Sequence, residues 1–155
     1  MSVKRRIAAD MTSAMKDGDK DRVAALRMLK AKMQVAEVEL RRDRGRDYEI
    51  DDEHALGALS SYAKQCMDSI ESYEAAGRED LAARERAELE IVRGYLPRQL
   101  GEEEVRGIVM QAIAEAHATS PKDIGAVMKI VMPRVKGAAD GKLVNRWVRE
   151  LLQGS

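Results

Sequence analysis

Cys66, His54 and His117 are the side chains of this sequence best suited to nucleophilic or metal-binding chemistry. A reactive thiol needs a neighbouring base or cation, and a metal site normally needs three or four ligands at recognisable spacing. Neither histidine lies near Cys66 in the sequence, and Cys66 falls on an apolar helical repeat. We therefore expect Cys66 to pack in a core and the histidines to lie at the surface or at helix caps. The sequence predicts no catalytic residue, no metal site and no cofactor.

Two short segments imitate ligand-binding loops. The aspartates at positions 17, 19 and 21 resemble the start of a calcium loop, but Arg22 and Met28 stand where that loop needs Gly and a bidentate Glu. Segment 137–142, Gly-Ala-Ala-Asp-Gly-Lys, resembles a phosphate-binding loop. Its glycines are separated by three residues instead of four, and Leu143 replaces the metal-binding Ser or Thr. We expect neither calcium binding nor nucleoside triphosphate binding.

Positive charge gathers near the C-terminus. Residues 118–155 contain seven basic and three acidic residues, a net charge of +4, although the chain as a whole has a formal net charge of zero. Exposed Lys and Arg on a rigid surface are the donors that contact a nucleic-acid backbone. The candidate phosphate contacts are Lys129, Arg134, Lys136, Lys142, Arg146 and Arg149. Gly125, Gly137 and Gly141 would let a backbone approach closely. From charge alone, an ordinary solvated face explains the same pattern.

The elements that would carry these residues are helices. Ser2 can cap a helix that runs to about Lys16, and Gly18 separates it from the next. The second and third helices each show apolar residues at alternating spacings of three and four, which predicts two long antiparallel helices packed as a hairpin. A fourth helix is expected from about Arg78 to Gly94. The arginine-rich segment 41–50 also holds acidic residues, so we expect a solvated loop there and not a nucleic-acid patch.

A second unit follows a boundary at residues 97–101, where Pro97 cannot continue a helix. Its three expected helices begin at the acidic run 102–104, at Ser120, and after Asp140, while Pro133, Gly137 and Gly141 mark a loop. We predict an all-α fold with a four-helix N-terminal domain (residues 1–97) and a three-helix C-terminal domain (residues 98–155). A unit of this size is near the lower limit for independent folding, so we expect it to draw support from the first.

Composition excludes several classes of protein. The chain has 155 residues, of which 45% are hydrophobic and 35% are charged, which is enough to form a core. No apolar run approaches the roughly 18 residues of a membrane span, and the basic N-terminus is not followed by an apolar signal region. The single cysteine indicates a reducing compartment. We expect a cytoplasmic protein with no membrane partner.

Two blocks of this sequence resemble the YqeY-like family, and together the similarity covers essentially the whole chain. The first block is Gly77-Arg78-Glu79-Asp80-Leu81 with Glu85, Glu88, Tyr95-Leu96-Pro97 and Gln99-Leu100. The second is Lys122-Asp123-Ile124-Gly125 with Met128-Lys129, the segment 137–142 and Asn145. Cys66-Met67 is a departure, since the resemblance leads us to expect a basic residue there. The resemblance implies a helical hairpin domain followed by a small three-helix domain.

The resemblance also implies a link to RNA. The C-terminal part of the family is similar to the tail domain of the B subunit of the tRNA-dependent amidotransferase, a carbon–nitrogen ligase that uses glutamine as its amido donor. That tail domain is associated with tRNA recognition, while the catalytic parts lie elsewhere in the assembly. Neither an amidase signature nor an ATP-binding cradle is present in this sequence. We expect an accessory module that binds tRNA and is not catalytic alone. The alternative is a protein-interaction or scaffold module that docks a partner and binds no nucleic acid.

Overall fold

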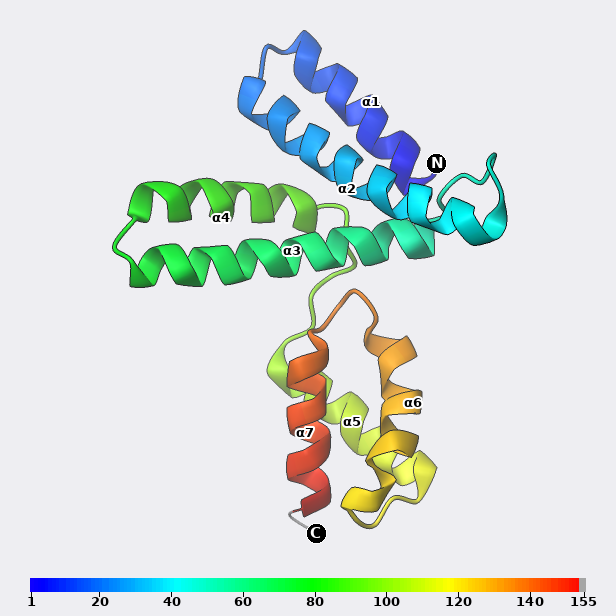
Figure 1. Cartoon of the computed structure of the whole chain (residues 1–155). Helices are drawn as coiled ribbons and strands as arrows, with labels where there is room; N and C mark the ends of the chain where they lie inside the picture. Colours follow the sequence, from blue (N-terminus) through cyan, green and yellow to red (C-terminus); the bar gives the residue numbers. More distant parts are fainter. Residues whose placement is uncertain (154–155) are drawn as a thin grey trace. The chain divides into compact units, whose positions relative to one another are not determined.

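The computed structural model describes residues 1–153, which form seven α-helices and one 3₁₀ turn and contain no strand (Figure 1). The helices are α1 (Val3–Lys16), α2 (Lys20–Arg44), α3 (Asp52–Ala75), α4 (Glu79–Arg93), α5 (Glu102–Ala116), α6 (Ile124–Val135) and α7 (Gly141–Gln153), with the 3₁₀ turn η1 (Pro121–Asp123) before α6. The all-α class predicted from the sequence is confirmed. None of these helices has the length and apolar character needed to cross a membrane.

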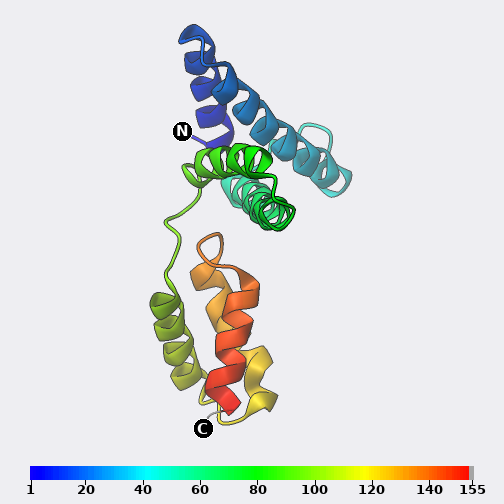
Figure 2. The same cartoon turned by 90° about the vertical axis from the view of Figure 1, so that its left-hand side faces the viewer.

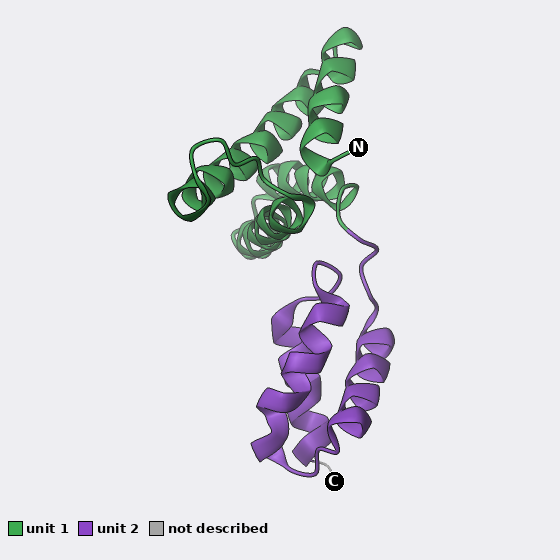
Figure 3. Ribbon diagram, turned by 90° about the vertical axis from the view of Figure 1, so that its right-hand side faces the viewer, with its two compact units in different colours: residues 1–96 green, residues 97–155 purple. Residues whose placement is uncertain are grey.

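The chain divides into two compact units, Met1–Leu96 and Pro97–Ser155, which Figure 3 colours separately. We call them unit 1 and unit 2. Unit 1 surrounds a hydrophobic cluster drawn from α1 to α4, and unit 2 surrounds a separate cluster drawn from α5 to α7. Each unit thus has an interior of its own.

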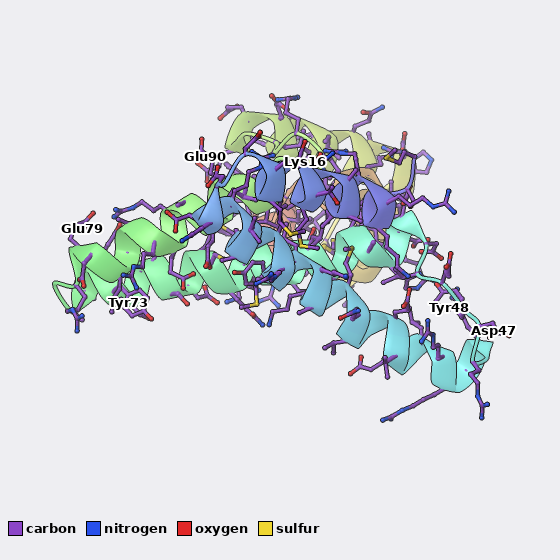
Figure 4. The ribbon with its side chains drawn as sticks, turned by 90° about the horizontal axis from the view of Figure 1, so that it is seen from above. Lys16, Asp47, Tyr48, Tyr73, Glu79 and Glu90 are labelled. Atoms are coloured by element: carbon purple, nitrogen blue, oxygen red, sulfur yellow. The ribbon has the colours of Figure 1, made fainter. Side chains whose placement is uncertain are left out.

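In unit 1 the most extensive packing joins α3 to α4 and α1 to α2, and Figures 1 and 2 both show these pairs side by side. The sequence predicts a hairpin of the second and third helices, but α2 packs more extensively against α1, and α3 against α4, than α2 and α3 pack against each other. Connection length explains the difference, because three residues separate the helices within each pair and seven separate α2 from α3. At the α3–α4 turn, which Tyr73 and Glu79 mark in Figure 4, Gly77 adopts a left-handed φ of 70° that glycine tolerates at little cost.

Three helices of unit 1 begin at side-chain caps. The side chains of Ser2, Asp19 and Asp51 each accept a hydrogen bond from the backbone N–H three residues further along, at 3.2, 3.2 and 2.8 Å. These bonds satisfy amide groups that have no partner within the helix. The helix starts predicted at Ser2 and after Gly18 are confirmed.

One carboxylate of unit 1, that of Glu37, is buried. Glu37 is only 5% exposed, yet it accepts hydrogen bonds from Lys4 Nζ at 2.8 Å, from the guanidinium of Arg41 at 3.1 Å and from the Ile50 amide at 2.9 Å. The Lys4 and Ile50 hydrogen bonds lower the pKa of Glu37, although burial acts in the opposite direction. Glu37 thereby ties α1 to α2 and to the segment that follows α2.

This arrangement corrects the prediction for residues 41–50. Residues 41–44 continue α2, Ile50 is buried, and Arg41 Nε donates to the Tyr48 carbonyl at 3.0 Å. Residues 42–47 and Glu49 are exposed, as predicted, whereas Tyr48, beside Asp47 in Figure 4, is half-buried. The charge pattern misled because one arginine is held by Glu37, a residue 13 positions before Ile50.

Unit 2 packs α5, α6 and α7 around an interior composed mostly of valine. Seven of its nine fully buried core residues are valines, namely Val105, Val109, Val127, Val131, Val135, Val144 and Val148. Pro133 was predicted to lie in a loop, but it lies inside α6. The helix continues past it because Val131 and Val135, one turn apart, are both buried against the same core. Gly141 is likewise not a loop residue, since it is the first residue of α7.

Candidate nucleic-acid interface

Helix α7 separates apolar from basic side chains. Asp140 caps it as predicted, accepting a hydrogen bond from the Lys142 amide at 3.0 Å. Val144, Val148 and Leu152 are buried, while the predicted contacts Lys142, Arg146 and Arg149 are exposed on the opposite face. The other apolar residues expected on the buried stripe, Leu143, Trp147 and Leu151, are half-buried at its edges.

The remaining predicted contacts belong to α6 and to the residue after it. Lys129 and Arg134 are exposed on α6, and Lys136 is exposed immediately beyond its end. Val127 and Val131, on either side of Lys129 in the sequence, are fully buried, so Lys129 projects away from the core. The six candidate basic residues therefore come from two helices and do not form a single stripe.

Two of these basic residues are held by carboxylates of α5. Arg134 pairs with Glu115 at 2.7 Å, and Arg146 pairs with Glu102 and, at 3.9 Å, with Glu150. Such exposed pairs contribute little to stability, but they neutralise part of the positive face. These pairings cannot be predicted from the sequence, in which the acidic run at residues 102–104 indicates only a helix start.

Three of the six basic residues have no acidic partner among residues 1–153. Lys129, Lys142 and Arg149 are exposed and take part in no salt bridge with any residue in the range 1–153. Each projects from a helix whose opposite face is packed into the valine core. The packed core fixes the backbone positions of these cations, while their side chains still have to be ordered when they contact a phosphate.

Arg106 is a basic residue of this surface that sequence reasoning missed. Its guanidinium lies 5.7 Å from the centre of the Trp147 ring, and that of Arg146 lies 5.5 Å from the same ring. Both distances allow cation–π attraction. The indole N–H of Trp147 is buried without a hydrogen-bond partner in the part of the chain that the structure describes. Arg106 follows Val105 on the apolar face of α5, and that adjacency was its only signal in the sequence.

The three glycines predicted to permit close backbone approach do not gather at one place. Gly137 and Gly141 flank the turn between α6 and α7, whereas Gly125 lies at the opposite end of α6 (Figure 1). Gly137 adopts a left-handed φ of 75°, and its carbonyl accepts a hydrogen bond from the Gln99 side chain at 2.9 Å. The neighbouring Ala138 carbonyl accepts from the Leu100 amide at 2.8 Å. The turn is therefore fastened to the residues that open unit 2.

Two comparisons with known proteins each match nearly the whole chain. Residues 4–152 match the YqeY-like protein family. The chain belongs to the YqeY-like family. It is also 30% identical over 152 residues to altered inheritance of mitochondria protein 41 from the fungus Pyrenophora tritici-repentis (strain Pt-1C-BFP), an alignment that spans 95% of this chain and 79% of the relative. That relative is named as mitochondrial, so the cytoplasmic location expected for this chain stays a prediction.

Glu85 and Glu88, two residues of the family resemblance, lie beside Cys66, the only cysteine of the chain. Cys66 on α3 and Glu85 and Glu88 on α4 place ligand-type atoms within 4.8 Å of one another, and the Tyr62 hydroxyl donates to Glu88 at 2.7 Å. Cys66 is 1% exposed, as expected for a core residue, and burial raises its pKa to about 11. At neutral pH, with no metal bound, Cys66 is therefore a thiol and a poor nucleophile.

Both histidines lie at helix caps, as predicted. His54 follows the N-cap of α3, and its Nδ1 lies 2.7 Å from the Asp51 carboxylate. His117 ends α5 in a left-handed conformation, with a φ of 52°. His54 lies twelve positions before Cys66 on the same helix, about three turns away, and His117 lies in unit 2, so neither histidine joins Cys66.

Proposed function

We propose that this member of the YqeY-like family is an accessory tRNA-binding module that contacts the phosphate backbone through unit 2 and performs no chemistry itself. The observation that carries the proposal is the set of three exposed, unneutralised cations, Lys129, Lys142 and Arg149, on helices packed into one core. Lys136 is exposed immediately after α6. Arg134 and Arg146 contribute only if their α5 carboxylates release them.

The resemblance of unit 2 to the tail domain of the amidotransferase B subunit is the reason for preferring tRNA among nucleic acids. On that basis we expect the protein to act beside the glutamine-dependent amidotransferase as a non-catalytic partner. The net charge of zero keeps non-specific attraction to nucleic acid weak, so binding has to come from this local surface.

A salt series tests the proposal. The purified protein is titrated with bulk tRNA and with duplex DNA between low and physiological salt. We expect selective tRNA binding whose logarithmic affinity falls linearly with the logarithm of salt concentration. The triple variant Lys129→Ala/Lys142→Ala/Arg149→Ala should reduce the magnitude of that slope by about one for each phosphate contact removed.

A matched control removes the same charge from unit 1. Lys16, Arg46 and Arg84 are exposed and form no salt bridge with residues 1–153, so their triple alanine variant should bind tRNA like the wild type. Absence of tRNA binding by the wild type at low salt would overturn the proposal. So would equal weakening by the two triple variants, because that result would indicate diffuse charge and no defined surface.

A further inference from the structure

Helix α2 carries a second apolar seam on the face turned away from its core. Its inward seam, Leu26, Leu29 and Met33, is buried. On the opposite side, Met28, Ala31, Val35 and Val38 repeat at spacings of three and four and are all exposed. The exposed fractions are 41% for Met28, 61% for Val35 and 58% for Val38. We call these four residues the outer seam.

The outer seam has no local reason to be apolar. Valine is a weaker helix former than the Lys, Glu and Gln residues that normally occupy exposed helical positions, because its branched side chain loses rotamer freedom. The other large apolar residues exposed along residues 1–153 are methionines on other elements, so only the outer seam repeats along one helix. A repeat of three and four is the pattern by which one helix packs against another.

The charges beside the seam indicate what covers it. On the side facing α1, the residues are Arg27, Lys30 and Gln34, and none of them is acidic. Lys20 and Arg27 also rim an apolar hollow between the end of α1 and the start of α2, lined by Met15, Val23 and Ala24. Ala24 lies one turn before Met28, so the hollow continues the seam. Lys20, Arg27 and Lys30 form no salt bridge with any described residue.

On the other side of the outer seam, α2 lies against α3. Lys32 lies 5.5 Å from the centre of the Tyr62 ring, and Glu39 is the nearest acidic residue further along this flank. Positive charge thus dominates one flank only. Residues 3–44 as a whole contain twelve Lys and Arg and seven Asp and Glu. A second copy of the same face would bring like charges together, so self-pairing through the seam is disfavoured.

We propose that the outer seam of α2 is a docking site for an amphipathic helix of a different protein, with apolar residues at heptad spacing and Asp or Glu along one flank. The apolar residues of that helix would cover Met28, Val35 and Val38. Its acidic flank would face Lys20, Arg27 and Lys30. This site lies in unit 1 and is independent of the tRNA surface proposed for unit 2.

Photo-crosslinking identifies the occupant. A benzoylphenylalanine at position 35 of the full-length protein is irradiated in the cells in which the protein is made, and the crosslinked segment is sequenced by mass spectrometry. Position 87 on α4, an exposed alanine, serves as the control. The expected product is a segment of another protein with apolar heptad spacing and an acidic flank. Crosslinks to RNA, lipid or a second copy, or none above the control, would overturn the proposal.

A peptide of the crosslinked segment then tests the two parts of the recognition. Val35→Ser/Val38→Ser and Arg27→Glu/Lys30→Glu should each weaken its binding at least about tenfold, measured by fluorescence anisotropy. Met110→Ser and Lys122→Glu, matched exposed positions in unit 2, should leave it unchanged. Wild-type affinity in the valine variant would contradict docking on the seam. Because all four substitutions lie in unit 1, tRNA binding by unit 2 succeeds or fails separately.

Discussion

The two units differ in whether a charged side chain is buried. Unit 1 buries a carboxylate, Glu37, and gathers Lys4, Arg41 and the Ile50 amide around it. Unit 2 has an interior of valine and leaves its arginines outside, in pairs such as Arg134–Glu115. A buried charge must be fully paired to be tolerated, whereas an exposed pair is worth little and exchanges readily with solvent or ligand. Exposed pairs occur in unit 1 as well, for example Arg86–Glu74, so among the described residues the difference between the units lies in the buried charge of unit 1 and its absence from the valine core of unit 2.

The largest effects should come from cavities in the two cores. Leu59→Ala in unit 1 should lower the free energy of unfolding by about 3 kcal/mol, and Val131→Ala in unit 2 by about 2 kcal/mol, since both side chains are fully buried. Trp147 is the only tryptophan, so its fluorescence reports unit 2, while circular dichroism reports both units. If the cores are independent, Leu59→Ala moves only the circular dichroism transition. A shift of the fluorescence transition in Leu59→Ala would show that the units unfold together.

The next largest loss of stability should come from removing the buried charge of Glu37. Glu37→Gln keeps the shape of the side chain but leaves Lys4 and Arg41 without their anion, and we expect a loss of about 2 kcal/mol in urea unfolding. Solvent moderates the loss, because both cations are more than one-third exposed. Glu39→Gln, at an exposed position on the same helix, should change stability by less than about 0.5 kcal/mol. Equal effects of the two variants would remove the basis of the comparison between the units.

The pH dependence of stability should sharpen the role of Glu37. Its folded-state pKa lies below the ordinary value of 4.5, so the unfolded chain takes up the proton first as pH falls. The stabilisation is therefore complete above about pH 5 and is lost as pH drops through the lowered folded-state pKa. The stability gap between the wild type and Glu37→Gln should narrow over that interval in urea titrations at successive pH values. A constant gap would mean that the carboxylate charge is not what the interior uses.

The smallest effect concerns the turn that fastens unit 2. Gly137→Ala places a Cβ at a left-handed φ of 75° and should cost about 1 kcal/mol. Gly107→Ala on α5, where no neighbouring atom lies within 4 Å of the added carbon, should stabilise by about 0.5 to 1 kcal/mol. Trp147 fluorescence measures both. The opposite signs are the diagnostic, and stabilisation by Gly137→Ala would contradict the turn geometry.

Local signals in the sequence were sufficient for most of the fold. Ser2, Asp19 and Asp140 predicted helix starts because capping depends on neighbours three residues away, and the spacing of three and four predicted the buried faces. Pro133 was assigned to a loop because the cost of proline in a helix is local, while the benefit of burying Val135 depends on the tertiary core. The same limit explains Glu37, whose burial depends on Lys4, 33 positions away.

The candidate site was less accessible from sequence than the fold. The six basic residues were recognised by type, but which of them are neutralised depends on where α5 lies relative to α6 and α7. Arg146 meets Glu102 across 44 positions, and Arg134 meets Glu115 across 19. The outer seam of α2 was also missed, because an exposed Val35 cannot be distinguished from a buried one until the partner helices are placed. Residue type thus identifies candidate groups, and topology decides which of them remain available.

The burial of Cys66 has a practical consequence for labelling. Because it is the only cysteine, almost wholly enclosed and protonated at neutral pH, the folded protein should be inert to maleimides and become reactive only on unfolding. The wild-type chain is then its own thiol-free background. A cysteine introduced at any exposed position accepts a single dye or spin label without prior mutation of the natural thiol. The slow rate at which Cys66 itself is labelled measures how often unit 1 opens.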